Sequence, residues 1–327
     1  MTFHVVIPTH RRLPLLERTL TSLAAARIPP DLERVIVLEN GCDEGAADLC
    51  KRFESRLPVE YHHRADAGKG RSLQWAIDRL QRGFVVLLDD DVRVSEGFLE
   101  EHASAARRLG RGHFFGGPLE IDYEEDGQPE EWLKRYLPPS ARGWRPANPH
   151  APCESLDFFK GANLGLFADD VLAVSGFMVA IGPGALVPGT EGNPTGLEDA
   201  LQRQMLRAGM SPVYLEGAVV WHWVPRERCS ESWALHRAYR NMSSSILRGE
   251  RSDPRSAARW LGVPPIEWGR YARDVLRVAL TTLVPDRRLR FHARSRLAKQ
   301  RGLIHGYRIA GVRGGLAYRN GKLASHG

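Results

Sequence analysis

Apolar runs of strand length alternate with helical patterns along the first 110 residues of the chain. Buried strands are predicted at Phe3–Ile7, Val35–Leu38 and Phe84–Leu88, and the last of these, FVVLL, is an uninterrupted run typical of a strand covered on both faces. Apolar positions three and four residues apart predict helices that begin near Pro14 and Leu73. The alternation predicts an α/β fold with a doubly wound, mostly parallel sheet, in which ligands bind at the carboxyl ends of the strands.

The pattern loosens after Ile121. Residues 122–160 are rich in proline and tryptophan, and long loops that hold aromatic residues often line a binding site. Further along the chain, the spacing predicts a helix at Leu197–Ala208, a strand at Pro212–Trp221 and a helix at Ser230–Leu247. Two or three basic helices are expected after them.

Charge divides the chain unevenly. Residues 251–327 hold 17 Lys and Arg against 4 Asp and Glu, a net charge of +13, whereas residues 1–250 hold 29 basic and 35 acidic residues, a net charge of −6. We therefore expect one large domain over 1–250, with halves at 1–121 and 122–250, and a basic helical extension over 251–327. The extension could contact an anionic membrane surface or a second copy of the chain, or be a solvated helical face. Nucleic acid is not expected as a partner.

Composition narrows the setting of the protein. The chain is 43% hydrophobic and 26% charged, as in a globular protein. Its four cysteines show no CxxC spacing, which argues against zinc and favours free thiols in a reducing compartment. The N-terminal segment lacks the apolar region of a signal peptide, and the uncharged stretch Val171–Thr190 is interrupted by glycine and proline. We expect a cytoplasmic protein, with peripheral contact to the inner face of the membrane as an open alternative.

Three adjacent aspartates, Asp89, Asp90 and Asp91, follow the FVVLL run directly. Adjacent carboxylates repel one another unless a cation neutralises them. Mg²⁺ and Mn²⁺ bind one or two carboxylates and fill the remaining positions with phosphate oxygens and water. The triplet therefore predicts a site for a metal and a diphosphate. Capping of the following turn is the structural alternative.

Other segments carry candidate residues with weaker signals. Lys69 opens a predicted helix in GKGR, where a phosphate could bind, although the segment can also be a plain turn. Glu39 follows the second strand and can accept the imide N–H of a uracil-type base, or belong to an ordinary loop. His222 ends a late strand and can complete a metal shell, or be a packed histidine.

Two acidic residues begin the helix predicted near Leu197. Thr195 and Glu198 have the spacing of a capping box, which accounts for Glu198 structurally. Asp199 has no such explanation. We expect its carboxylate to face the ligand cleft if the preceding loop folds over the sheet edge.

Taken in order, these segments resemble glycosyltransferase family 2, which has the GT-A fold. The resemblance runs from about Val5 to Gly249. It rests on the motifs VVIPTHRR, ENGCD, GKGRSLQWAI, FVVLLDDDV, GANLGLF (161–167), GLEDALQRQMLRAG (196–209) and VVWHWVPRER (219–228).

The resemblance implies a hexosyltransferase that moves a sugar, with inversion, from a nucleotide diphosphate sugar, most readily a UDP-linked one. The acceptor would be a small molecule, a lipid-linked sugar or a glycan, and the cofactor Mn²⁺ or Mg²⁺. Asp199 matches the general base of the family, and Asp91 and His222 match residues at the metal. The residues expected at the donor are Pro8, Thr9, Arg11, Glu39, Lys69, Asp89, Asp90, Asn163 and Glu198.

The chain also departs from the family pattern. Glu39 stands where aspartate is usual, Cys42 where serine is common and Gln74 where asparagine is common, which leaves the donor in question. Two other functions stay open. A sugar nucleotidyltransferase would favour a glycine-rich loop after the first strand, where this chain has PTHRRLPLL. A nucleotide-sugar-binding protein without activity is the second, against which the retained aspartates argue.

Overall fold

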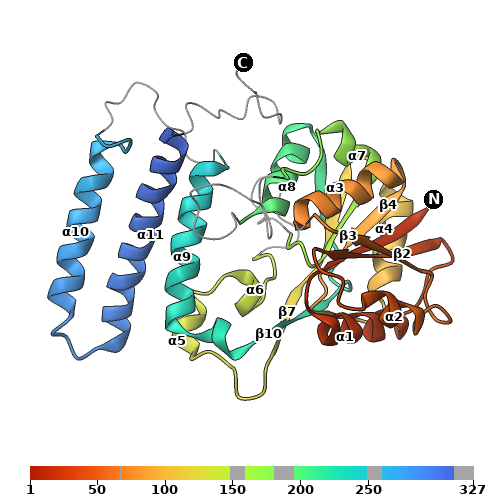
Figure 1. Cartoon of the computed structure of the whole chain (residues 1–327), viewed down its shortest axis with the longest axis horizontal. Coiled ribbons are helices and arrows are strands. Elements are labelled where there is room, and N and C mark those ends of the chain that lie inside the picture. Colours follow the sequence, from red (N-terminus) through yellow and green to blue (C-terminus); the bar gives the residue numbers. More distant parts are fainter. Residues whose placement is uncertain (67, 148–158, 180–194, 249–259, 313–327) are drawn as a thin grey trace. The chain divides into compact units, whose positions relative to one another are not determined.

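The computed structural model of the chain describes residues 1–66, 68–147, 159–179, 195–248 and 260–312 (Figure 1). The chain divides into two compact units. The first comprises Met1–Glu124, Pro139–Ala185 and Leu197–Val224. The second comprises Glu125–Pro138, Leu186–Gly196 and Pro225–Gly327. The helix predicted at 230–247 thus groups with the C-terminal helices, and the domain boundary near residue 250 stays a prediction.

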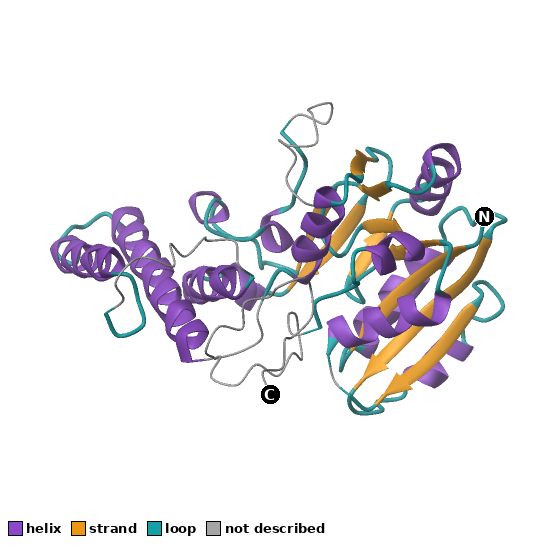
Figure 2. Cartoon of the chain, turned by 90° about the horizontal axis from the view of Figure 1, so that it is seen from above, coloured by secondary structure: helices purple, strands orange, loops and turns teal. Residues whose placement is uncertain are grey.

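A seven-stranded mixed sheet forms the centre of the first unit (Figure 2). Its strand order is β3-β2-β1-β4-β8-β6-β9. The first four of these run parallel, and β8 is antiparallel to both of its neighbours. The strands are β1 (Phe3–Thr9), β2 (Leu32–Asn40), β3 (Val59–Arg64), β4 (Phe84–Leu87), β6 (His113–Gly116), β8 (Leu164–Phe167) and β9 (Ser211–Tyr214).

A smaller sheet of three strands lies in the same unit, in the order β5-β10-β7. It contains β5 (Val92–Val94), β7 (Leu119–Tyr123) and β10 (Val220–Val224). The single strand predicted at 212–221 is therefore wrong. Its residues divide between β9 in the large sheet and β10 in the small one, because the backbone turns at Leu215–Ala218, where the N–H of Ala218 donates to the carbonyl of Leu215.

Helices cover the large sheet and close the core of the first unit. All seven residues of β1 and all four of β4 are buried, as expected for strands with both faces covered. In α1 the leucines Leu16, Leu20 and Leu23 are fully buried on one face. The helices are α1 (Leu13–Ala24), α2 (Ala46–Lys51), α3 (Lys69–Leu80), α4 (Phe98–Leu109), α6 (Pro139–Arg142), α7 (Ala168–Ala173) and α8 (Leu197–Arg207). The predicted α/β fold with a doubly wound mixed sheet is confirmed.

The second unit is helical where the structure describes it. It contains α5 (Glu131–Lys134), η2 (Arg226–Cys229), α9 (Glu231–Leu247), α10 (Pro265–Thr281) and α11 (Arg287–Val312). Ser230 caps α9, because its hydroxyl accepts the N–H of Trp233 at 3.2 Å. Helix α11 packs against both α9 and α10, so α10 is at the edge of this unit (Figure 1). The expected basic helical extension is present as α10 and α11.

The structure bears on the helices, the uncharged stretch and the cysteines that the sequence singled out. None of the helices in the described ranges combines the length and the apolar character that crossing a bilayer requires. Helix α7 ends at Ala173, and residues 180–190 of the uncharged stretch lie outside the described residues. The thiols of Cys42, Cys50 and Cys229 are free, and Cys153 lies outside the described residues.

Candidate functional site

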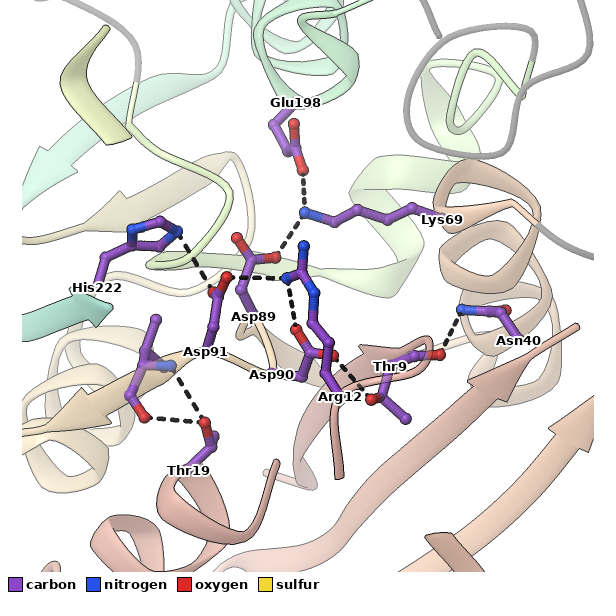
Figure 3. Close-up of polar contacts among 11 residues, drawn as sticks. Thr9, Arg12, Thr19, Asn40, Lys69, Asp89, Asp90, Asp91, Glu198 and His222 are labelled. Atoms are coloured by element: carbon purple, nitrogen blue, oxygen red, sulfur yellow. Dashed lines mark hydrogen bonds and ion pairs between the residues drawn. The ribbon is translucent and has the colours of Figure 1, made fainter. Parts of the chain in front are cut away.

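The three aspartates lie in the segment that joins β4 to β5. Because β1 and β4 are parallel neighbours, the residues that follow these strands meet at one edge of the sheet. Thr19 of α1 fixes this segment: its hydroxyl donates to the carbonyl of Val92 at 2.8 Å and accepts the N–H of Val92 at 3.1 Å (Figure 3). Asp90 and Asp91 are each only 4% exposed. The sequence thus places charged side chains in a buried, rigid segment.

His222 reaches the triplet from β10. Pairing of β10 with β5 sets His222 opposite Val92, and the backbone N–H of Trp223 donates to the carbonyl of Asp91 at 2.8 Å. The Nε2 atom of His222 lies 3.3 Å from Oδ1 of Asp91 (Figure 3). Candidate ligand atoms of Asp89, Asp91 and His222 all lie within 4.8 Å of one another.

These three residues fit a divalent metal. Oδ1 of Asp91 and Nδ1 of His222 are buried without a hydrogen-bond partner, so the 3.3 Å contact of Asp91 with His222 is close but not aligned as a hydrogen bond. A buried polar atom left unpaired is costly, and a ligand that pairs with it recovers that cost. Two carboxylates and an imidazole are also a donor set that Mn²⁺ and Mg²⁺ accept.

Arg12, which follows β1, is bound to the triplet and was missed from the sequence. Its Nη1 lies 2.9 Å from Oδ2 of Asp91 and 3.2 Å from Oδ1 of Asp90. Burial opposes the charge of Arg12, but Asp91 and Asp90 outweigh it and raise the pKa of Arg12. The adjacency of β1 and β4 was the available signal, since any arginine just after β1 can reach residues just after β4.

Arg11 was predicted to line the nucleotide pocket, and its side chain contacts the loop after β2. The backbone of Arg11 has a φ of 55°, which turns the chain between the two arginines. Its guanidinium donates to Sγ of Cys42 at 3.2 Å and lies 3.3 Å from Glu44. Arg11 therefore belongs with the loop after β2, and its contact with a nucleotide stays a prediction.

Asp90 points to the end of β1. Oδ2 of Asp90 accepts the hydroxyl of Thr9 at 2.7 Å, and Oδ1 accepts from Arg12. Burial and the charge of Asp91 raise the pKa of Asp90 to about 6, although Arg12 and the hydroxyl of Thr9 act in the opposite direction. Pro8 is buried beside Thr9. Asp90 thus ties the two strand ends together, which supports Asp89 and Asp91.

Lys69 connects the triplet to α8. Its Nζ lies 2.6 Å from Oδ1 of Asp89 and 2.6 Å from Oε1 of Glu198 (Figure 3). Burial alone would lower the pKa of Lys69, but the two carboxylates outweigh it and raise it. Burial likewise opposes the ionisation of Asp89, yet its ion pair with Lys69 lowers the pKa of Asp89. Lys69 and Asp89 are therefore both charged at neutral pH.

The capping box predicted for Thr195 and Glu198 does not form. Helix α8 begins at Leu197, so Thr195 lies one residue too early to cap it. The N–H of Thr195, which a capping box would pair with Glu198, donates to Oγ of Ser244 at 3.0 Å. Glu198 instead belongs to the charged cluster through Lys69, and Asp199, partly buried, is next to it in the first turn of α8.

Glu39 is at the centre of a separate polar group, at the ends of β2 and β3. It is 2% exposed. Its Oε1 accepts the N–H of Glu44 at 2.9 Å and its Oε2 accepts the hydroxyl of Tyr61 at 2.5 Å. Asn40 links this group to β1, because its side-chain nitrogen donates to the carbonyl of Thr9 at 3.3 Å. Asn40 also accepts the hydroxyl of Ser72 in α3, so three elements are held at this edge.

Asn163 is buried inside the first unit and is not part of the charged cluster. Its side-chain nitrogen donates to the carbonyls of Ala218 at 2.7 Å and Pro118 at 3.3 Å, while its Oδ1 is 3.0 Å from Nε2 of His102. The side chain has no exposed surface. These contacts give Asn163 a structural role, and its predicted contact with the donor sugar stays a prediction.

The strand edge thus holds a group that we call the acidic cluster, made of Asp89, Asp90, Asp91, Glu198, Lys69, Arg12 and His222. It contains four carboxylates and two cationic side chains joined by ion pairs. Such an excess of negative charge at the carboxyl ends of parallel strands is suited to a cation and its ligand.

Comparison with known proteins identifies the class. Residues 4–164 match the model of Glycosyl transferase family 2. Validoxylamine A glucosyltransferase from Streptomyces hygroscopicus subsp. limoneus is 38% identical over 64 residues, which are 20% of this chain and 14% of that protein. Succinoglycan biosynthesis protein ExoM from Rhizobium meliloti is 32% identical over 127 residues, 37% of this chain and 40% of that protein. The matches therefore span less than half the length of either relative.

A solved structure extends the likeness to the whole fold. Mannosyltransferase PcManGT from Pyrobaculum calidifontis, determined in complex with GDP-Man and Mn²⁺, superposes with a TM-score of 0.55. The alignment covers 93% of this chain and 85% of that one at 15% identity, so the likeness concerns the fold. Residues 4–164 place this part of the chain in glycosyltransferase family 2.

Proposed function

We propose that the chain is an inverting glycosyltransferase that uses a nucleotide diphosphate sugar and a divalent metal. The observation that carries the proposal is the acidic cluster, in which Asp89, Asp91 and His222 offer ligand atoms within 4.8 Å of one another beside the cations Lys69 and Arg12. The family match over residues 4–164 and a fold like that of a mannosyltransferase determined in complex with GDP-Man support it.

Mn²⁺ or Mg²⁺ would be held by Asp91 and His222, with Asp89 beside them. When bound, such an ion neutralises the diphosphate and makes it a better leaving group. Asp90 and Arg12 fix the position of Asp91 from the other side. The mannosyltransferase of similar fold was determined with Mn²⁺ bound, which is consistent with this choice of metal.

Donor binding falls to the residues on either side of the cluster. Lys69 stands at the start of α3, where backbone N–H groups and a cationic side chain favour a phosphate. Glu39 would accept the imide N–H of uracil through a second lone pair of its carboxylate, which favours a UDP-linked donor. Thr9 and Pro8 would line the same pocket from the end of β1.

Asp199 would act as the general base. Its carboxylate takes the proton of the acceptor hydroxyl while the acceptor oxygen forms a bond to the anomeric carbon and the bond from that carbon to the diphosphate oxygen breaks. The electron pair of the broken bond leaves with the diphosphate, and the anomeric centre inverts. Of the two carboxylates in this turn, Glu198 is held by Lys69, whereas Asp199 stands where the family resemblance places the base.

Three classes of acceptor remain candidates: a small molecule, a lipid-linked sugar and a glycan. The names of the relatives include a glucosyltransferase of validoxylamine A and a protein of succinoglycan biosynthesis, which represent a small molecule and a polysaccharide. Trp144, one of the aromatic residues expected at the acceptor, is 5% exposed and packs against Phe159 and Tyr214. It supports the fold and not an acceptor surface.

A donor screen tests the proposal. The protein is mixed with Mn²⁺ and, separately, UDP-, GDP-, ADP- and TDP-linked sugars, and donor hydrolysis and thermal stability are followed. We expect a UDP-sugar to raise the melting temperature most and to be hydrolysed slowly. If no donor is hydrolysed and none raises the melting temperature, the result would argue against sugar transfer. Release of diphosphate from a nucleoside triphosphate with a sugar 1-phosphate would instead support a nucleotidyltransferase.

A further inference from the structure

Helix α10 in the second unit buries its acidic side chains and exposes several of its apolar ones. The two acidic side chains of α10, Glu267 and Asp274, are 5% and 3% exposed. Both face α11: Oε2 of Glu267 accepts from Nε2 of Gln300 at 2.8 Å, and Arg296 lies 3.5 Å from Asp274. A helix that faced only water would normally place its carboxylates outside and its apolar side chains against the neighbouring helix.

The outer face of α10 is apolar. Large hydrophobic side chains of the helix and of the turn after it are strongly exposed, and Leu276 and Leu280 lie about one helical turn apart on the side opposite Glu267 and Asp274. The exposed side chains are Ile266 (64%), Val275 (41%), Leu276 (59%), Leu280 (68%) and Leu283 (90%). Trp260 (60%) and Leu261 (61%) precede the helix. Exposed hydrophobic residues that are contiguous, and not scattered singly, mark a surface that contacts another apolar phase.

The exposed charges of α10 are of one sign. Its other charged residues are Arg270, Arg273 and Arg277, whose side chains are 46%, 56% and 39% exposed. Arginine keeps its charged head in a polar layer while its stem lies along apolar surface. A second copy of the chain placed face to face on α10 would bring arginine against arginine, so charge disfavours self-association here. A negatively charged surface complements this face.

We propose that α10 lies flat on an anionic membrane surface, with Leu276, Leu280 and Leu283 inserted among the lipids and the arginines at the head groups. At 17 residues the helix is about 25 Å long and carries five charged residues, so it suits the interface and not the bilayer core. Trp260, exposed just before the helix, is of a residue type that favours the boundary between head groups and acyl chains. The inference concerns the second unit and holds whether or not the proposed transfer reaction is correct.

Vesicle flotation of the full chain tests this inference. Vesicles of phosphatidylcholine alone and of phosphatidylcholine with phosphatidylglycerol are compared at two salt concentrations. We expect binding to the anionic vesicles, weakened by salt. The double variant Leu276→Gln, Leu280→Gln should bind at least about tenfold more weakly, since both side chains lose their insertion. Arg273→Gln should lose about fivefold on anionic vesicles and little on neutral ones.

The matched control is Ile28→Gln, which replaces an apolar side chain of the first unit that is 41% exposed. It should float like the unchanged protein, and circular dichroism should show all variants folded. The inference is overturned if the unchanged protein does not float, or if the leucine double variant floats equally well. It is also overturned if gel filtration shows a dimer that the same double variant dissociates, because a second copy would then cover this face.

Discussion

Two of the regions that bury carboxylates in this protein treat them differently. Between α10 and α11, Glu267 accepts from Arg270 at 2.7 Å and from Gln300 at 2.8 Å, and Asp274 accepts from Arg277 at 2.9 Å. In the acidic cluster, four carboxylates share Lys69 and Arg12, and Oδ1 of Asp91 is buried without a hydrogen-bond partner.

The difference separates a structural use of buried charge from a ligand site. The helix pair needs nothing further, because each carboxylate has its own donors. The acidic cluster has two more negative than positive side chains, and one divalent cation would balance it. An excess of carboxylates over cations, more than burial alone, is therefore the feature that supports the proposed metal site.

The largest expected effect belongs to a carboxylate outside both groups. Asp199→Asn should lower sugar transfer by about two to four orders of magnitude, because the acceptor would lose its general base. The affinity for Mn²⁺ and for UDP should change little, since Asp199 is not one of the metal-binding residues. Initial rates and calorimetry measure the two quantities. Transfer at close to the unchanged rate would place the base elsewhere.

The next largest effect concerns stability against pH and comes from His102, a buried side chain that stays neutral in the folded protein. His102 is fully buried, and burial lowers its pKa to about 4 although its hydrogen bond to Asn163 opposes the shift. The unfolded chain takes up a proton near pH 6.5 and the folded chain does not. The contribution of neutral His102 to the free energy of unfolding is therefore fully present above pH 6.5. It is lost as pH falls toward 4, by about 3 kcal/mol.

Urea unfolding at several pH values measures this loss. His102→Gln removes the titrating group and should flatten the slope of stability between pH 6.5 and 4. The exposed His63→Gln serves as the control and should keep the slope. An unchanged slope in His102→Gln would assign the acid sensitivity to other groups.

A smaller and more discriminating effect comes from neutralising one carboxylate in each region. Asp274→Asn should destabilise the protein by about 1–3 kcal/mol, because a buried charge-assisted hydrogen bond is weakened. Asp91→Asn should cost less, or stabilise the metal-free protein, because it relieves repulsion with Asp90. Donor binding should be weakened by Asp91→Asn and left nearly unchanged by Asp274→Asn. Equal destabilisation by both variants would break the distinction between the two regions.

The smallest effect is expected for Glu198→Gln. If Glu198 capped α8, its loss would mainly reduce stability. Its carboxylate instead lies 2.6 Å from Nζ of Lys69, so we expect Glu198 to position Lys69. We expect a change in the KM for the donor of about a fewfold with little change in the free energy of unfolding. Kinetics and urea unfolding on the same preparation separate the two. A loss of stability alone would restore a purely structural role.

Patterns within one strand or helix were predictable from the sequence. The FVVLL run placed β4 and the aspartates at its end, and Ser230 marked the start of α9. Local pattern succeeds here because burial on both faces and an N-cap depend on neighbouring residues alone.

Features that depend on other parts of the chain were missed. Arg12 reaches Asp91 because of a turn at Arg11, and two adjacent arginines look alike in sequence. The expected strand at 212–221 divides because its halves pair in different sheets. Glu198 fits a capping pattern in the sequence, yet its carboxylate pairs with Lys69, which lies more than a hundred residues earlier in the chain. Contacts between distant parts of the chain decide all three.

The central claim is that the acidic cluster binds a divalent metal together with a nucleotide diphosphate. Calorimetric titration of UDP into the unchanged protein, with Mn²⁺ and then with a chelator, tests it most directly. We predict binding only in the presence of Mn²⁺, and its loss in Asp91→Ala but not in Asp274→Asn. Equal affinity for UDP with metal and with chelator, and in Asp91→Ala, would contradict the account.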